Sequence, residues 1–118
     1  MTGVTRFEDI EGWQLAKELT REIYRLATTT ALSHDFGLRD QLQRAAVSAM
    51  ANIAEGFDCD SHAEFARFLG IARRSAAEVQ SLLYVARDAG YISPETFQTL
   101  YDLAGRTKRK ISAFKATL

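Results

Sequence analysis

The sequence lacks the features that mark secreted, membrane-spanning or strongly charged proteins. Its one cysteine, Cys59, cannot form an internal disulfide. No run approaches the roughly 20 apolar residues that span a bilayer, and the first residues lack the basic start and apolar run of a signal peptide. Fifteen basic residues balance fifteen acidic ones, so the net charge attracts neither nucleic acid nor anionic lipid. We expect a cytoplasmic chain that contacts no membrane.

Proline and glycine are also scarce, with one and seven residues in a chain of 118. Since Ala, Leu, Arg and Glu are abundant and favour helix, we predict an all-α fold with a single domain over residues 1–118. Apolar spacing and capping residues predict helices over about 9–29, 37–56, 61–89 and 94–116. The short links between them favour an antiparallel up-down-up-down four-helix bundle.

Particular residues mark the predicted helix ends. Asp9 has the side chain of an N-cap for the first helix, and Ser61 and Ser93 have those for the third and fourth. Gly56 and Gly90 follow apolar helical runs. Because glycine readily adopts a left-handed conformation, we expect each of these two glycines to end its helix in that conformation.

The second predicted helix has an unusually wide apolar face, made largely of alanine. At helical spacing it carries Leu38, Leu42, Ala45, Ala49 and Ile53. Small side chains let neighbouring helices approach closely, so we predict that the other helices pack on this one, or that it forms a subunit contact. We interpret Asn52 and Glu55 at its edge as structural polar groups, the first hydrogen-bonded to a neighbouring helix and the second paired with an arginine.

Several short motifs, in this order and spacing, resemble one bacterial family. They are Trp13-Gln14-Leu15-Ala16, Phe36-Gly37-Leu38, Asn52-Ile53-Ala54-Glu55-Gly56, Glu64-Phe65 and Ala89-Gly90-Tyr91-Ile92. Together they resemble the small four-helix bundle proteins encoded in intervening sequences of 23S rRNA genes. The resemblance implies a homo-oligomer, specifically a pentamer, of unestablished biochemical role. The similarity of that family to the accessory protein of diversity-generating retroelements implies an RNA or ribonucleoprotein partner. Arg74 departs from the family pattern, which usually has glycine there.

The last helix contains an acid-free basic cluster. Its members are Arg106, Lys108, Arg109, Lys110 and Lys115. Their side chains suit contact with phosphate groups, and a cyclic oligomer would repeat the cluster on every subunit. The alternative is a solvated face whose charges favour the helix dipole.

A second basic set lies on the third helix and consists of Arg67, Arg73 and Arg74. One hypothesis assigns these arginines to phosphate or to an intersubunit pair. The alternative is ion pairing inside the bundle. The available carboxylates are those of Glu55, Glu64 and Glu78.

Other chemistry-bearing residues form no recognisable site. Asp58, Cys59, Asp60 and His62 are close in sequence but match neither zinc nor calcium spacing, and His34 has no nucleophile to serve. We therefore predict no catalytic residue, no metal and no cofactor. Tyr24 on the first helix either closes the core with its hydroxyl in water or contributes to self-association, and Tyr84 on the third has the same two alternatives.

Two hypotheses of function stay open. The first is a non-enzymatic homo-oligomeric scaffold whose repeated basic surfaces bind RNA or a ribonucleoprotein. The second is a protein-binding adaptor with no nucleic-acid affinity. We do not expect a hydrolytic enzyme, which would need pocketed carboxylates with perturbed pKa values.

Overall fold

Four α-helices make up most of the chain in the computed structural model, which describes residues 3–118. They are α1 (Glu11–Thr29), α2 (Phe36–Phe57), α3 (His62–Asp88) and α4 (Pro94–Lys115). A short 3-10 turn, η1 (Phe7–Asp9), precedes α1, and a second, η2 (Ala31–His34), links α1 to α2. None of the helices in the described residues is long and apolar enough to cross a membrane. The predicted all-α class is confirmed.

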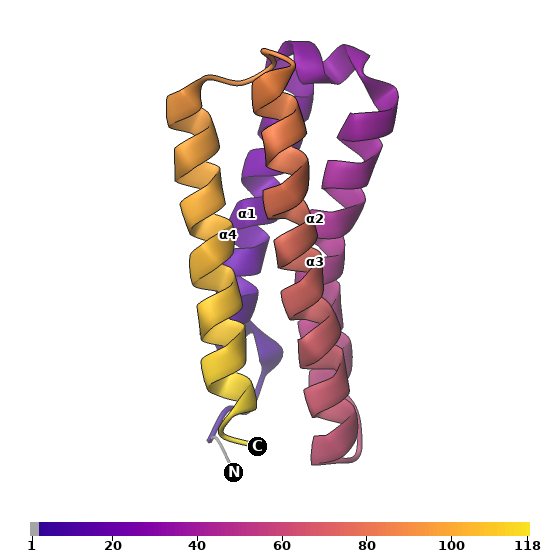
Figure 1. Ribbon diagram of the computed structural model, residues 1–118. Coiled ribbons are helices and arrows are strands. Elements are labelled where there is room, and N and C mark those ends of the chain that lie inside the picture. Colours follow the sequence, from indigo (N-terminus) through magenta and orange to yellow (C-terminus); the bar gives the residue numbers. More distant parts are fainter. Residues whose placement is uncertain (1–2) are drawn as a thin grey trace.

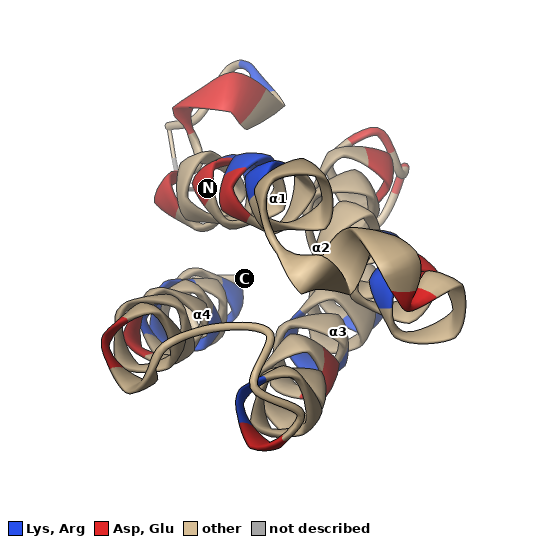
Figure 2. Cartoon of the chain, turned by 90° about the horizontal axis from the view of Figure 1, so that it is seen from above, with Lys and Arg blue, Asp and Glu red and all other residues tan. Residues whose placement is uncertain are grey.

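Successive helices run in opposite directions (Figure 1). The links after α1 and α3 lie at one end of the bundle, and the link after α2 lies at the other end with the C-terminus. Viewed along the bundle, the helices stand around a ring in chain order (Figure 2). Each packs extensively on its two ring neighbours, and α4 closes the ring against α1. The molecule is an antiparallel four-helix bundle of 45 × 22 × 19 Å.

The predicted central position of α2 is wrong. Its predicted apolar face is buried from Leu38 to Ile53, but its extensive contacts are with α1 and α3, whereas α4 packs on α3 and α1. A ring of four helices gives every member two neighbours, so the remaining width of the α2 stripe stays at the surface. Val47 accordingly remains 37% exposed.

A layer of hydroxyl groups lies between two apolar clusters of the core. Thr20, Ser48 and Ser75 connect α1, α2 and α3, whereas the Thr107 hydroxyl on α4 donates to the carbonyl of Leu103 in its own helix. The Thr20 hydroxyl donates to the carbonyl of Ala46 on α2 at 3.0 Å, and the hydroxyl oxygens of Ser48 and Ser75 lie 2.8 Å apart. No buried side-chain nitrogen or oxygen in residues 3–118 lacks a partner. Because sliding one helix past another would break these bonds, the layer favours a single register.

The start of α1 corrects the prediction for Asp9. Asp9 lies in η1, with its Oδ1 atom 3.5 Å from the Nε atom of Arg6, and does not cap the helix. The N-cap position is Ile10, which has extended backbone and makes no side-chain cap bond. Ile10 is instead fully buried in the core. Burial of an apolar side chain therefore fixes the start of α1, two residues later than the sequence predicts.

Gly56 does not end α2 in a left-handed conformation, as we predicted. Among the described residues only Gly3 and Gly90 have positive φ. Gly56 is buried inside α2, where a Cβ atom would lie 2.7 Å from the Cβ of Phe68 and 2.9 Å from the Cδ1 of Phe65. The missing side chain is needed because α2 and α3 approach closely there.

The remaining predicted helix ends follow the local rules. Ser61 and Ser93 cap α3 and α4, since each side chain accepts a hydrogen bond from the amide three residues later. After α3, Gly90 has φ of 79°. The amide of Tyr91 donates to the carbonyl of Ala86 at 2.9 Å, the bond that closes a helix ending at such a glycine.

A single carboxylate ties two links together at one end of the bundle. Asp35 caps α2 by accepting from the amide of Leu38 at 3.2 Å, and its other oxygen accepts from the hydroxyl of Tyr91 at 2.9 Å. This hydrogen bond, reinforced by partial desolvation and by the carboxylate charge, raises the pKa of Tyr91. The pKa of the Tyr91 hydroxyl in the folded protein therefore lies above its value of about 10 in the unfolded chain. Below about pH 10 the hydrogen bond contributes its full stabilisation to the folded state, and this contribution is lost as the pH rises through the raised pKa.

We expect Tyr91→Phe to lower the midpoint of thermal unfolding at pH 7, because the protonated Tyr91 hydroxyl stabilises only the folded state. Melting curves recorded by circular dichroism at pH 7 and above pH 10 test this. The difference between the unfolding midpoints of the wild type and the variant should be smaller at the higher pH. Tyr24→Phe is the matched control, since the Tyr24 side chain makes no hydrogen bond with residues 3–118. Equal midpoints at pH 7 would contradict the assigned role.

Candidate functional site

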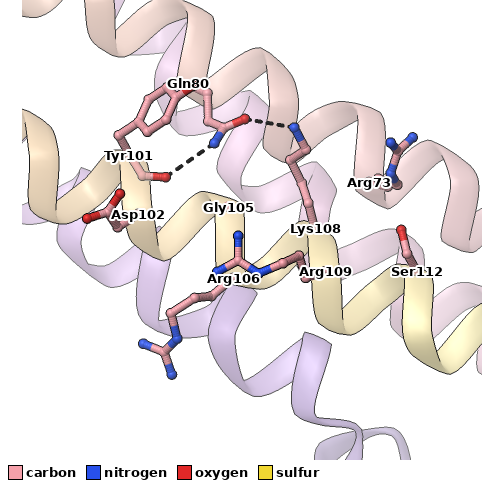
Figure 3. Close-up of a pocket in the computed structure, with 9 residues that line it drawn as sticks. All are labelled: Arg73, Gln80, Tyr101, Asp102, Gly105, Arg106, Lys108, Arg109 and Ser112. Carbon is pink, nitrogen blue, oxygen red and sulfur yellow. Dashed lines mark hydrogen bonds between the residues drawn. The ribbon is translucent and has the colours of Figure 1, made fainter.

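A groove runs along the surface between α3 and α4 (Figure 3). It has a volume of about 690 Å³. Its lining comprises Arg73, Gln80, Tyr101, Asp102, Gly105, Arg106, Lys108, Arg109 and Ser112. The groove thus joins an arginine from one predicted basic set to three members of the other, although the two sets lie far apart in the sequence.

Gln80 forms the floor of the groove. It is buried, and its Nε2 atom donates to the carbonyl of Tyr101 on α4 at 3.2 Å. Its Oε1 atom accepts from the Nζ atom of Lys108 at 2.9 Å. Lys108 is therefore held in place by a neutral amide, so its positive charge is not compensated by a carboxylate.

Arg73 and Arg109 provide further positive charge. Both are exposed, and neither makes an ion pair with any residue in 3–118. The Arg109 side chain lies alongside Gly105, whereas Arg106 points away from Gln80 (Figure 3). The one carboxylate of the lining, Asp102, accepts from the amide of Gln98 at 2.9 Å. Four cations and one carboxylate make this groove locally positive on a chain of zero net charge.

The positive surface continues toward the C-terminal end of α4. A Cβ atom on Gly70 of α3 would lie 3.6 Å from the Nη1 atom of Arg74 and 3.6 Å from the Nζ atom of Lys115. Because Gly70 has no side chain, cations from both helices come close together over it. The structure therefore places Arg74 and Lys115 beside each other, on the same pair of helices as the groove.

Two predicted basic residues lie outside this surface. The Nε atom of Arg67 lies 3.2 Å from Oε2 of Glu64, and its guanidinium lies over the Phe68 ring at 4.8 Å. The hydrogen bond to Glu64, reinforced by that carboxylate's charge, raises the pKa of Arg67. The Nζ atom of Lys110 lies 3.2 Å from Oε2 of Glu11 on α1. The predicted alternative of ion pairing, with Glu64 as the partner, describes Arg67. Lys110 is exposed, but its pair with Glu11 was not predicted.

Sequence reasoning missed the groove residues that carry no charge. Gln80 is a polar residue at a buried position between Val79 and Leu83 of the apolar stripe, and this interruption was the available signal. Gly105 lies inside α4, where glycine weakens a helix and therefore often marks close contact. Tyr101 and Ser112 gave no such signal.

Asn52 and Glu55 do not act as predicted. The Nδ2 atom of Asn52 donates to the carbonyl and the hydroxyl of Ser48, each at 2.9 Å, so both bonds stay within α2. Ser48 makes the connection to α3 through Ser75. Glu55 is exposed and has no ion pair with residues 3–118. The side-chain amide of Asn52 thus finds its partner one turn earlier in the same helix, and the carboxylate of Glu55 is exposed to solvent.

The link between α2 and α3 holds the clustered polar residues considered for metal. Within residues 3–118 no three His, Cys, Asp or Glu side chains converge in a way that would hold a metal ion. Partial desolvation and the negative charges of Glu64, Asp58 and Asp60 raise the pKa of the Cys59 thiol. At neutral pH this thiol is therefore less nucleophilic than an ordinary cysteine.

Comparison with known proteins places this bundle in a family. Residues 8–113 match the family model described as 23S rRNA-intervening sequence protein. No curated protein matches the chain. Among solved structures, the fold is similar to that of a protein of unknown function from the S23 ribosomal protein family of Bacteroides thetaiotaomicron, with a TM-score of 0.79 and 21% identity over 88% of this chain and 97% of that chain. Because the family model spans nearly the whole sequence, the chain belongs to the 23S rRNA-intervening sequence protein family.

Proposed function

We propose that this chain is a non-enzymatic, homo-oligomeric scaffold that works in the cytoplasm and binds RNA, free or in a ribonucleoprotein. The observation that carries the proposal is the groove between α3 and α4, where Arg73 and Arg109 face solvent and, like the half-buried Lys108, have no carboxylate paired to them. The proposal assigns no catalytic step, metal or cofactor to the chain.

The chemistry of the groove suits a phosphate backbone. Arginine guanidinium groups bind phosphate oxygens through paired N–H donors, and each neutralised phosphate releases condensed counterions. The unpaired state of Arg73 and Arg109 matters here, because an arginine already bound to a carboxylate would have to give up that partner first.

Self-association is the second part of the proposal. Apolar side chains other than that of Tyr84 are exposed on α1, α2 and α3, namely Tyr24, Phe36, Val47 and Val85. Their burial between subunits would stabilise an oligomer. We propose the pentamer that the family resemblance implies. Each subunit would then carry one groove, so weak contacts with a single RNA would add by multivalency.

A salt titration tests the nucleic-acid part of the proposal. Binding of a fluorescent structured RNA, and of a DNA of matched sequence, would be followed by anisotropy at several salt concentrations. We expect the logarithm of the association constant to fall linearly with the logarithm of salt concentration. Absence of RNA binding even at low salt would overturn the assignment.

The same exposed apolar side chains favour a second candidate, a protein-binding adaptor with no affinity for nucleic acid. Phe36 is 63% exposed although it is a large aromatic residue, which suits recruitment of a protein partner. Tagged protein recovered from its host cells separates the two candidates. A stoichiometric protein partner that remains after nuclease treatment supports the adaptor, whereas RNA without such a partner supports the scaffold.

A further inference from the structure

The groove between α3 and α4 ends at a cluster of three aromatic rings. The ring centroids of Tyr84 and Phe97 lie 4.8 Å apart, those of Phe97 and Tyr101 lie 5.5 Å apart, and those of Tyr84 and Tyr101 lie 5.8 Å apart. Phe97 is buried and Tyr84 is 42% exposed. Tyr101 belongs both to this cluster and to the lining of the groove. An exposed aromatic surface is therefore continuous with the cationic surface.

The two surfaces extend along the helix axes. On α3, the path from Tyr84 past Arg73 to Gly70 covers about 21 Å at 1.5 Å per residue. On α4, the path from Tyr101 to Arg109 covers about 12 Å. The guanidinium of Arg87 lies over the Tyr84 ring, 4.9 Å from its centre, and pairs with the carboxylate of Asp88 at 3.1 Å, so it adds no net charge to the aromatic end. This combination of exposed ring and row of cations spans the length of several nucleotides.

We infer that the ligand of this groove is a single-stranded nucleic acid, with a base stacked on Tyr84 and the following phosphates along Arg73 and Arg109. The inference rests on the proposed function and specifies its ligand. Base-on-tyrosine stacking requires an unstacked base, which a single strand offers and the interior of a duplex does not. Every base has such a face, so the groove binds with little sequence preference. An acidic peptide would use the cations but gain nothing comparable from the ring.

Anisotropy titrations with a labelled single-stranded oligouridylate and a labelled RNA duplex of the same length test the inference. The variants are Tyr84→Leu, which keeps an apolar group over Phe97 but removes the aromatic face, and Tyr84→Phe, which keeps the face. We expect Tyr84→Leu to weaken single-strand binding about fivefold to a hundredfold. Tyr84→Phe should bind like the wild type. Tyr24→Leu is the matched control, because Tyr24 is equally exposed but lies on α1, away from the groove. Melting curves verify that each variant is folded.

The outcomes distinguish the inference from the function on which it rests. Single-strand binding that exceeds duplex binding, and that depends on the ring of Tyr84 alone, supports both. Equal binding of strand and duplex, or no effect of Tyr84→Leu, overturns the inference while leaving RNA binding intact. Binding of a labelled polyglutamate peptide but of neither RNA overturns both.

Discussion

Replacing Gly56 by alanine is expected to lower the free energy of unfolding by about 1–3 kcal/mol. In an open helix the same change would stabilise the protein by roughly 0.5–1 kcal/mol, because alanine is the better helix former. Here the new methyl group would overlap the Cβ of Phe68 at 2.7 Å and the Cδ1 of Phe65 at 2.9 Å. The Cβ of Phe68 is fixed to the backbone, so relief requires α2 and α3 to move apart.

Gly70→Ala is the matched control for this prediction. Gly70 is also a helical glycine beside another helix, but its added methyl would meet only the flexible ends of Arg74 and Lys115, at 3.6 Å. We expect Gly70→Ala to leave stability unchanged or to raise it slightly. Urea unfolding followed by circular dichroism measures both variants. Equal free energies of unfolding for Gly56→Ala and Gly70→Ala would show that the stability of the bundle does not depend on the close approach of α2 and α3 at Gly56.

Reversing the charge of Arg73 and Arg109 together is expected to reduce RNA affinity by at least about tenfold at physiological salt. Each arginine that contacts one phosphate contributes a slope of roughly 0.7 to 0.9 to the dependence of log K on log salt. The double variant Arg73→Glu/Arg109→Glu should therefore bind more weakly, with a slope shallower by about 1.4 to 1.8. An oligomer that binds one RNA through several subunits would lose more affinity, because every subunit carries the two substitutions.

Arg21→Glu/Arg44→Glu is the control with the same change in net charge. Arg21 on α1 and Arg44 on α2 are exposed and have no ion pair with residues 3–118. If binding depended only on overall charge, the two double variants would lose affinity equally. Loss confined to the Arg73/Arg109 pair locates binding in the groove. Unchanged affinity and slope in that variant would contradict the assignment.

Local sequence rules predicted the helix ends only where the deciding contacts are local. Ser61, Ser93 and Gly90 satisfy backbone groups within a few residues of themselves, so their roles follow from the sequence alone. Gly56 has the same position after an apolar run as Gly90, yet Phe65 and Phe68 from the next helix decide its role. Asp9 lost its expected role for a similar reason, since burial of Ile10 fixes the helix start.

The candidate site could be predicted only in part for the same reason. The sequence identifies Arg73 and Arg109 as basic residues on two different helices, but it does not state which residues of two antiparallel helices face each other. That register depends on packing, including the hydrogen bonds of Gln80 across the groove to Tyr101 and Lys108. The ion pair of Lys110 also escaped prediction, because Lys110 and Glu11 meet only when α4 closes the ring against α1.

Sedimentation of the purified protein with a fluorescent RNA at physiological salt tests the central claim most directly, because one run reports both subunit number and RNA binding. The proposed scaffold predicts a species of pentamer size that carries the RNA with it. A pentamer that leaves the RNA behind would contradict the groove assignment and favour the protein adaptor. A monomer that leaves the RNA behind would contradict both parts of the proposal.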